Sequence, residues 1–325
     1  MKTRSVATPL SQVLALTWAI AACATTQQSG SGAVLVTQEG SRITMVFPAD
    51  RDLLDAAKSR NVVKARTAIA NGANLRFEDP SPRPLLQPPP PPARPPPPLF
   101  IAASNGGTEV VEVLLDNGVP VDARDEESGG TALIAASAAG EFDTVSLLLD
   151  RGADPNARTL NAFSALMFAS AFGHFPVTTL LIASGAEVNV QNNLGNAPLQ
   201  LAAHNSGDTD TVVLLLNKGA NIDARSNDGW TALIDAIDMN HVAAAKVLIE
   251  RGANVNLAAQ TGWTALMASA VKGHADLAAM LIAHGADVNA KAFQGTANPT
   301  TALSAARSMH HADVVKVLEQ AGARQ

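Results

Sequence analysis

Residues 131–163 read TALIAASAAGEFDTVSLLLDRGADPNARTLNAF, and this stretch decides the fold. It opens on Thr131-Ala132-Leu133 and continues as an alanine-rich apolar run that stops at Gly140. A second apolar run follows from Val145 to Leu149. Gly152 comes after it, at a point where a helix commonly ends in a left-handed residue. The stretch therefore predicts two short helices joined by a glycine turn and followed by a polar connection.

The same pattern recurs along most of the chain at a nearly constant spacing. The leucine of the Thr-Ala-Leu motif returns at intervals of 33, 33, 34, 33 and 37 residues, at Leu133, Leu166, Leu199, Leu233, Leu266 and Leu303. A glycine follows most of these leucines by 19 residues, but it follows Leu199 by 20 residues. Such a period indicates a stack of small helix pairs that bury their apolar faces against their neighbours.

This repeat resembles the ankyrin repeat, whose T-P-L-H-x-A core is degenerate here to T-A-L-x-x-A. The resemblance implies an all-α ankyrin-repeat solenoid, built of helix-turn-helix units with β-hairpin fingers. About eight units are expected over residues 50–325, including a degenerate first unit and a C-terminal cap with polar outward side chains.

Two segments depart from the repeat. Leu53 and Leu99 lie 46 residues apart, because a proline-rich insert at 80–98 lengthens the period by 13 residues. Proline fixes φ and has no N–H, so the insert is expected to adopt polyproline II, as a stiff loop or as a motif that docks on an aromatic groove. Residues 33–48 predict a small β-hairpin that covers the first repeat or pairs with a partner, with disorder as the remaining alternative.

Residues 1–22 have the layout of a secretory signal peptide. Lys2 and Arg4 give a positive start, and the apolar run that follows is shorter than the roughly 20 residues that span a bilayer. The small polar residues at 23–32 predict a flexible tether between this segment and the rest of the chain.

The segment ends in Ile20-Ala21-Ala22-Cys23, which resembles the lipobox of bacterial lipoproteins. The resemblance implies acyl chains on Cys23 and a membrane anchor. Ala24, in place of the Asp that retains such proteins in the inner membrane, implies an outer-membrane lipoprotein that faces the periplasm. The alternative is an ordinary signal peptide cut after Ala24, which gives a soluble periplasmic or secreted protein.

Composition excludes several classes of function. The formal net charge is −6, and an acidic chain without a basic stripe repels phosphate backbones, which argues against nucleic-acid binding. The single cysteine, Cys23, allows neither an internal disulfide nor a cysteine-based zinc cluster.

A search for catalytic or cofactor motifs finds none. The histidines that follow Gly173 and Gly273, and His241 at the equivalent place, are spread one per repeat and are expected to tie neighbouring loops by hydrogen bonds. A metal site at His204, Asp208 and Asp210 is an alternative, against which Asp208 or Thr209 is expected to cap the next helix. The sequence therefore predicts no enzyme, no catalytic residue, no metal, no cofactor and no small-molecule substrate.

A partner protein is expected to contact two sets of variable positions. One set precedes the T-A-L threonine, and the other lies five and six residues after the leucine. The predicted contacts are Phe163, Phe172, Asn196, His204, Trp230, Asp238, Met239, Trp263 and Lys272. Exposed aromatic residues mark interaction sites, although these aromatics could instead pack between the fingers. The expected function is a protein–protein interaction module of the bacterial envelope; the alternatives are a secreted or surface-exposed effector that binds host proteins and a metal-dependent enzyme.

Overall fold

The computed structural model describes residues 48–75, 96–293 and 299–324. The predicted signal peptide, tether and hairpin lie outside the described residues. So does most of the proline-rich insert, of which only the last three residues are described. The first helix begins at Pro48, two residues before the predicted start of the repeat domain.

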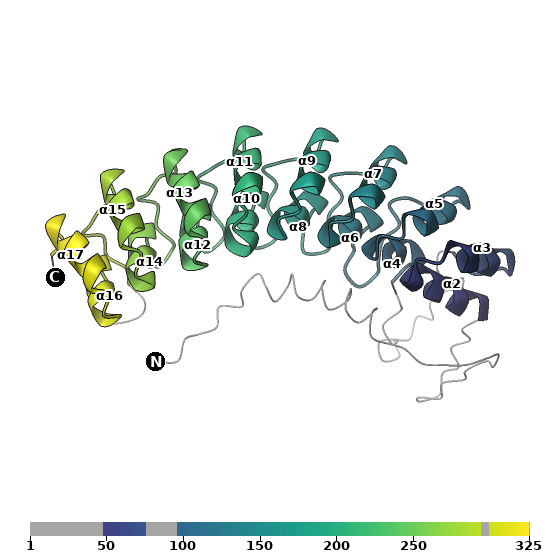
Figure 1. Ribbon diagram of the computed structural model, residues 1–325, viewed down its shortest axis with the longest axis horizontal. Helices are drawn as coiled ribbons and strands as arrows, with labels where there is room; N and C mark the ends of the chain where they lie inside the picture. The colour runs from purple at the N-terminus through teal and green to yellow at the C-terminus, as the bar shows by residue number, and fades with distance from the viewer. Residues whose placement is uncertain (1–47, 76–95, 294–298, 325) are drawn as a thin grey trace, which may run out of the picture. The chain divides into compact units, whose positions relative to one another are not determined.

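The described residues form pairs of short helices that fall into two compact units. Unit 1 comprises the described residues up to Ala165 together with 183–185. Its helices are α2 (Pro48–Ser59), α3 (Val62–Ala70), α4 (Pro98–Ser104), α5 (Thr108–Asp116), α6 (Ala132–Ala139) and α7 (Phe142–Asp150). The first helices of its pairs, α2, α4 and α6, pack in succession, and α3, α5 and α7 pack beside them (Figure 1).

Unit 2 comprises residues 166–182 and the described residues from 186 onward. It contains all of α8 (Ala165–Ala171) but the first residue and all of α9 (Phe175–Ala183) but the last. Its other helices are α10 (Pro198–Leu201), the π-helix η1 (Ala202–Ser206), α11 (Thr209–Asn217), α12 (Ala232–Asp238), α13 (Val242–Glu250), α14 (Ala265–Lys272), α15 (Ala275–Ala283), α16 (Ala302–Ser308) and α17 (Ala312–Gln320). The helix pairs predicted from the repeat are thus confirmed, with α10 and η1 together serving as one first helix.

The threonine of the T-A-L motif starts the first helix of each pair in which it occurs. Thr131, Thr231, Thr264 and Thr301 are extended N-cap residues, and each hydroxyl accepts a hydrogen bond from the backbone N–H three residues later. A side-chain acceptor at this position satisfies one of the N–H groups that a helix leaves unpaired at its start. The motif is therefore a helix-start signal.

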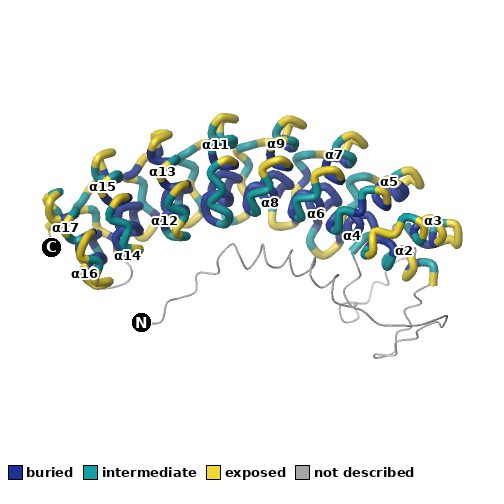
Figure 2. Tube along the Cα trace, in the orientation of Figure 1, coloured by how far each residue is buried: buried dark blue, intermediate teal, exposed yellow. Residues whose placement is uncertain are grey.

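The core is made of small aliphatic side chains. First helices inside the stack are buried almost all round, as in α6, where every residue from Ala132 to Ala138 is buried. The terminal first helices α2 and α16 also carry exposed residues. The second helices bury one stripe only, as in α7, where Val145 and Leu148 are fully buried and the opposite face is open (Figure 2). This difference explains why the first helices are rich in alanine, because close approach on both sides leaves no room for larger residues.

The predicted β-hairpin fingers are present as loops with single bridges, and the described residues contain no extended strand. The bridges join Arg124 to Thr131 and Arg158 to Ser164 in unit 1, and Ala258 to Thr264 and Ala292 to Thr300 in unit 2. Consecutive fingers are linked by backbone hydrogen bonds, such as the N–H of Gln260 to the carbonyl of Asp228 at 2.9 Å. A glycine with positive φ turns most fingers, but Ala162 takes this place in one of them with a φ of 61°.

Candidate partner-binding face

The two units divide the predicted contact residues. Phe163 lies in unit 1 and is only 3% exposed, so its ring is buried. In unit 2, Asn196 and His204 are buried. Phe172, Trp230, Asp238, Met239 and Trp263 are half-buried, and Lys272 is exposed. The residues of unit 2 that remain open to a partner therefore come mainly from the finger ends before α12 and α14 and from the C-terminal ends of the same helices.

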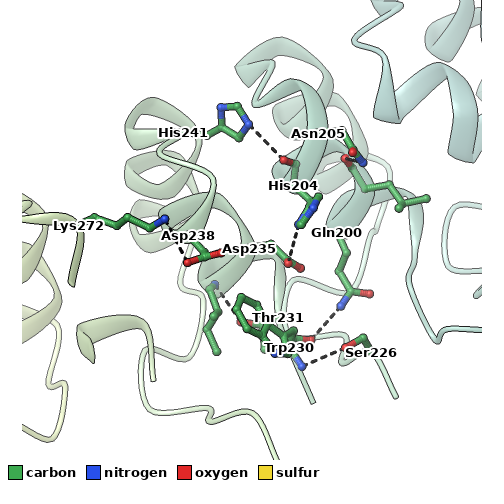
Figure 3. Close-up of polar contacts among 12 residues, drawn as sticks. Gln200, His204, Asn205, Ser226, Trp230, Thr231, Asp235, Asp238, His241 and Lys272 are labelled. Carbon is green, nitrogen blue, oxygen red and sulfur yellow. Dashed lines mark hydrogen bonds and ion pairs between the residues drawn. The ribbon is translucent and has the colours of Figure 1, made fainter. Parts of the chain in front are cut away.

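Trp230 and Trp263 occupy equivalent places, each immediately before the threonine that caps a first helix. The backbone of Trp230 is fixed, because its N–H donates to Ser226 Oγ at 3.1 Å and its carbonyl accepts from Gln200 Nε2 at 2.9 Å (Figure 3). The carbonyl of Trp263 accepts from the N–H of Ala259 at 2.8 Å. Among the described residues, no hydrogen bond engages either indole N–H, and neither nitrogen is a buried, unpaired atom. Each tryptophan thus has a fixed backbone and an indole N–H that is free to donate a hydrogen bond.

Phe172 is partly used in packing. Its ring stacks on Phe168 with centroids 6.5 Å apart and lies 6.0 Å from the ring of His174. These contacts favour the packing role for Phe172. The two tryptophans have no such ring contact among the described residues, which favours the binding role for them.

The extra residue after Leu199 is absorbed by the π-helix η1. A π-turn holds one more residue than an α-turn, so the extra residue fits within η1, which ends at Ser206 with Gly207 as its C-cap. Gly207 has a φ of 61°, and a Cβ atom there would collide with the imidazole of His241. The one-residue irregularity in the repeat spacing is thus the signal for this turn.

The π-turn places His204 against Asp235 of α12. His204 Nδ1 and Asp235 Oδ1 are 3.0 Å apart, and both side chains are 9% exposed (Figure 3). Burial raises the pKa of the Asp235 carboxyl above its usual value, the hydrogen bond and charge of His204 oppose this shift, and the charge of Asp238 adds to it. His204 was predicted as a partner contact, but in the structure its imidazole faces the neighbouring repeat.

Sequence reasoning missed Asp235, although a signal existed. The residue four positions after the first residue of the T-A-L motif is apolar in the other units, at Ala135, Phe168, Leu201, Ala268 and Ala305. A carboxyl group at this buried helix position needs a hydrogen-bond partner. The only histidine in the preceding first helix, His204, supplies it.

Two more predicted residues are brought together at the end of α12. Asp238 Oδ1 and Lys272 Nζ are 3.4 Å apart, and each side chain is about one-third exposed. An ion pair this open contributes little to stability but fixes a charge pattern on the surface. It stands beside Met239, the C-cap residue of α12.

His241 ties neighbouring repeats together, as predicted for the loop histidines, and His311, which was not among them, does the same. His241 Nε2 lies 3.2 Å from the carbonyl of His204, and His311 Nε2 lies 2.9 Å from the carbonyl of Val271. His274 departs from this pattern, because its Nε2 is buried and finds no partner among the described residues. Burial lowers the pKa of His274, and the charges of Lys272 and His311 lower it further.

The side chains of the alternative metal site do not converge on a common point. Asp208 caps α11, as one of the two predicted capping residues, by accepting hydrogen bonds from the N–H and hydroxyl of Thr211. Asp210 is exposed, and His204 is engaged by Asp235. Within the described ranges, no three His, Cys, Asp or Glu side chains gather as metal ligands.

Two further surface features complete the description of unit 2. A hollow of about 590 Å³ is lined by residues 187–190 and Lys218, and one of about 270 Å³ lies around His274 at the start of α15. Neither includes a tryptophan. None of the described helices has the length and apolar character needed to cross a bilayer.

Comparison with known proteins agrees with this architecture. The family model for ankyrin repeats, in three copies, matches residues 53–159, 166–259 and 252–325. The crystal structure of the human ASB11 ankyrin repeat domain is similar, with a TM-score of 0.61 and 26% sequence identity, over 69% of this chain and 97% of that chain. No curated protein matches the sequence significantly. Because the family model covers most of the chain, this protein belongs to the ankyrin-repeat family and has its helical solenoid fold, which serves as a protein–protein interaction module.

Proposed function

We propose that this ankyrin-repeat protein is a binding module of the bacterial cell envelope. It is anchored through acyl chains on Cys23 and holds a partner protein on the fingers and first helices of unit 2, as a scaffold, an inhibitor or a protective binder. The single observation that carries the binding site is the pair of half-buried indoles at Trp230 and Trp263, each with a fixed backbone and a free N–H.

Aromatic anchors with one apolar and one polar end suit this role. Tryptophan is enriched among the few residues that carry most of the binding energy in protein interfaces, because it removes a large apolar area from water and still offers a donor. The Asp238–Lys272 pair and Met239 lie at the ends of the same first helices and add a polar and an adaptable apolar contact.

The binding site is tested by capture from envelope extract, with the full-length chain as bait. The Trp230→Ala/Trp263→Ala variant is expected to bind the captured partner at least about tenfold more weakly, because two central aromatic anchors are removed. Phe175→Ala is the matched control, since this ring is 40% exposed but lies at the start of a second helix. Equal loss in the control, or equal capture by all three proteins, places the partner elsewhere. Unfolding of the double variant supports the packing role instead.

The anchor is tested separately by substitution of the cysteine. Cys23→Ser removes the thiol that would carry the acyl chains, so the protein is expected to move from the membrane fraction to the soluble envelope fraction. Fractionation followed by immunoblotting measures the distribution, and metabolic labelling with a fatty acid reports acylation. An unchanged membrane fraction in Cys23→Ser argues against a lipid anchor without affecting the binding site.

A further inference from the structure

The His204–Asp235 pair is a polar contact between η1 and α12, set among buried apolar side chains of α12. Around Asp235, α12 buries Ala232, Leu233, Ile234, Ala236 and Ile237. The Nδ1–Oδ1 distance of 3.0 Å joins the two helices directly. A buried hydrogen-bonded pair of two titratable groups gives this contact a dependence on proton binding that an apolar contact lacks.

The second ring nitrogen of His204 is the unusual feature of the pair. Nε2 is buried and has no hydrogen-bond partner within the described residues. With a neutral imidazole and an ionised Asp235, Nδ1–H donates to the carboxylate and Nε2 carries an unpaired acceptor.

One added proton changes this acceptor into a donor. If the proton stays on the imidazole, Nε2 carries N–H. If it moves to Asp235 and the carboxyl donates to Nδ1, the remaining ring proton again resides on Nε2. When the added proton lies on the imidazole or on Oδ1 of Asp235, the protonated pair therefore contains a buried N–H without an acceptor, an arrangement that folded proteins rarely tolerate. Only a proton on Oδ2 of Asp235 leaves Nε2 as an acceptor.

The groups around the pair define its electrostatic setting. Asp238 lies one turn further along α12 and is itself held by Lys272 of α14 at 3.4 Å. His241, at the start of α13, lies 3.2 Å from the His204 carbonyl, and Asp208 caps α11. The short helix α10 carries no charged residue. Burial raises the pKa of the Asp235 carboxyl, His204 opposes this shift, and the charge of Asp238 adds to it.

Trp230 is positioned by α10, which continues directly into η1, and by α12. Gln200, one turn before His204, donates through Nε2 to the Trp230 carbonyl at 2.9 Å. Thr231, next to Trp230, caps α12 one turn before Asp235. A change in the spacing of η1 and α12 is therefore expected to move the backbone of Trp230 and also Asp238, which lies further along α12 (Figure 3). Met239, the C-cap residue of α12, would move with it.

We propose that protonation of the His204–Asp235 pair loosens the contact between η1 and α12 and thereby displaces Trp230. The pair then acts as a switch, and mild acid lowers the affinity for the partner. The switch rests on the proposed function for its biological meaning, but the movement of Trp230 is a property of the free protein. Histidine is the side chain that ordinarily changes charge between about pH 5 and 8, so the test covers this interval.

The test follows Trp230 fluorescence in the full-length chain. The variant Trp18→Phe/Trp263→Phe leaves Trp230 as the only tryptophan. Between about pH 8 and pH 5 its emission is expected to shift to longer wavelength, and quenching by acrylamide is expected to increase, because the loosened contact exposes the indole to water. The same chain with His204→Gln, which retains a donor towards Asp235 but does not titrate, is expected to show neither change.

Two variants separate the switch from other causes. His284→Gln removes an exposed histidine at the C-cap of α15 and is expected to leave the pH response intact. Asp235→Asn is expected to abolish the response, and it remains informative if His204→Gln fails to fold by circular dichroism. A constant Trp230 signal across the pH range, or an unchanged response in both His204→Gln and Asp235→Asn, overturns the switch. Capture through Trp230 and Trp263 at neutral pH does not depend on that outcome. The capture experiment therefore tests the proposed binding function independently of the switch.

Discussion

The variant His204→Leu is expected to lower the free energy of unfolding of unit 2 by about 3 kcal/mol near pH 8. The substitution leaves the Asp235 carboxylate buried, at 9% exposure, without its hydrogen-bond partner. Removing one partner of a buried pair lowers the free energy of unfolding by more than the intact pair contributes. The remaining charge is shielded from water and has no partner to compensate for its lost hydration. Urea unfolding followed by circular dichroism and by tryptophan fluorescence measures the change.

The double variant His204→Leu/Asp235→Ala is the informative control. Alanine is the residue that Ala135, Ala268 and Ala305 provide at the position of Asp235, so the register accepts it. Because no charge is then stranded, the double variant is expected to recover to within about 1 kcal/mol of the unsubstituted protein. If it is as unstable as His204→Leu, the loss comes from packing around the π-turn and the unpaired carboxylate is not its cause.

The pH dependence of the single variant has a definite sign. Burial raises the pKa of Asp235 above the value of 3.8 that applies to the unfolded chain. The stability contributed by a group with a raised pKa is fully present below the unfolded value and is lost as the pH rises through the folded value. His204 normally opposes the rise, so its removal raises the folded pKa further. The deficit of His204→Leu relative to the unsubstituted protein should therefore shrink as the pH falls from about 8 to about 4.

The periodic features of the sequence were enough to predict the repeat architecture. The T-A-L motif marked the start of each unit, and its threonines Thr231 and Thr264 cap the first helices. The recurring glycines marked the ends of the second helices, as at Gly252, whose φ is 86°. These signals are local, because a helix start and a helix stop depend on residues within one turn, and repetition at a fixed spacing separates them from chance.

The candidate site could be predicted only in part, because burial depends on the neighbouring repeat. Phe163 and Asn196 hold the same position as Trp230 and Trp263, yet the first two are buried and the last two are half-exposed. The repeat pattern assigns all four to one class, and only the packed structure distinguishes them. Asp235 and the π-turn are single departures from the pattern, and their meaning appears only when the two are seen in contact.

Alanine at the finger glycine Gly262 should destabilise the protein more than alanine at Gly252, although the two glycines have nearly the same φ. Their φ angles are 82° and 86°, so alanine at either site is strained in the left-handed region by about 1–2 kcal/mol. A Cβ at Gly252 would meet nothing within 4 Å, whereas one at Gly262 would lie 2.6 Å from the carbonyl oxygen of Lys291 and 3.1 Å from Ala292 Cα. Both atoms belong to the backbone of the next finger, so they cannot move away by a change of side-chain rotamer.

Gly262→Ala is therefore expected to lower the free energy of unfolding by about 2 kcal/mol more than Gly252→Ala does, since the second finger must move away. That movement breaks the 2.8 Å hydrogen bond from the N–H of Phe293 to the carbonyl of Thr261, and it shifts the adjacent Trp263. Urea unfolding of both variants measures the difference in stability. At a temperature where both remain folded, Gly262→Ala should also reduce partner capture while Gly252→Ala retains it. Equal stabilities would mean that the fingers separate freely; a stability difference with equal capture would mean that the partner does not depend on the position of Trp263.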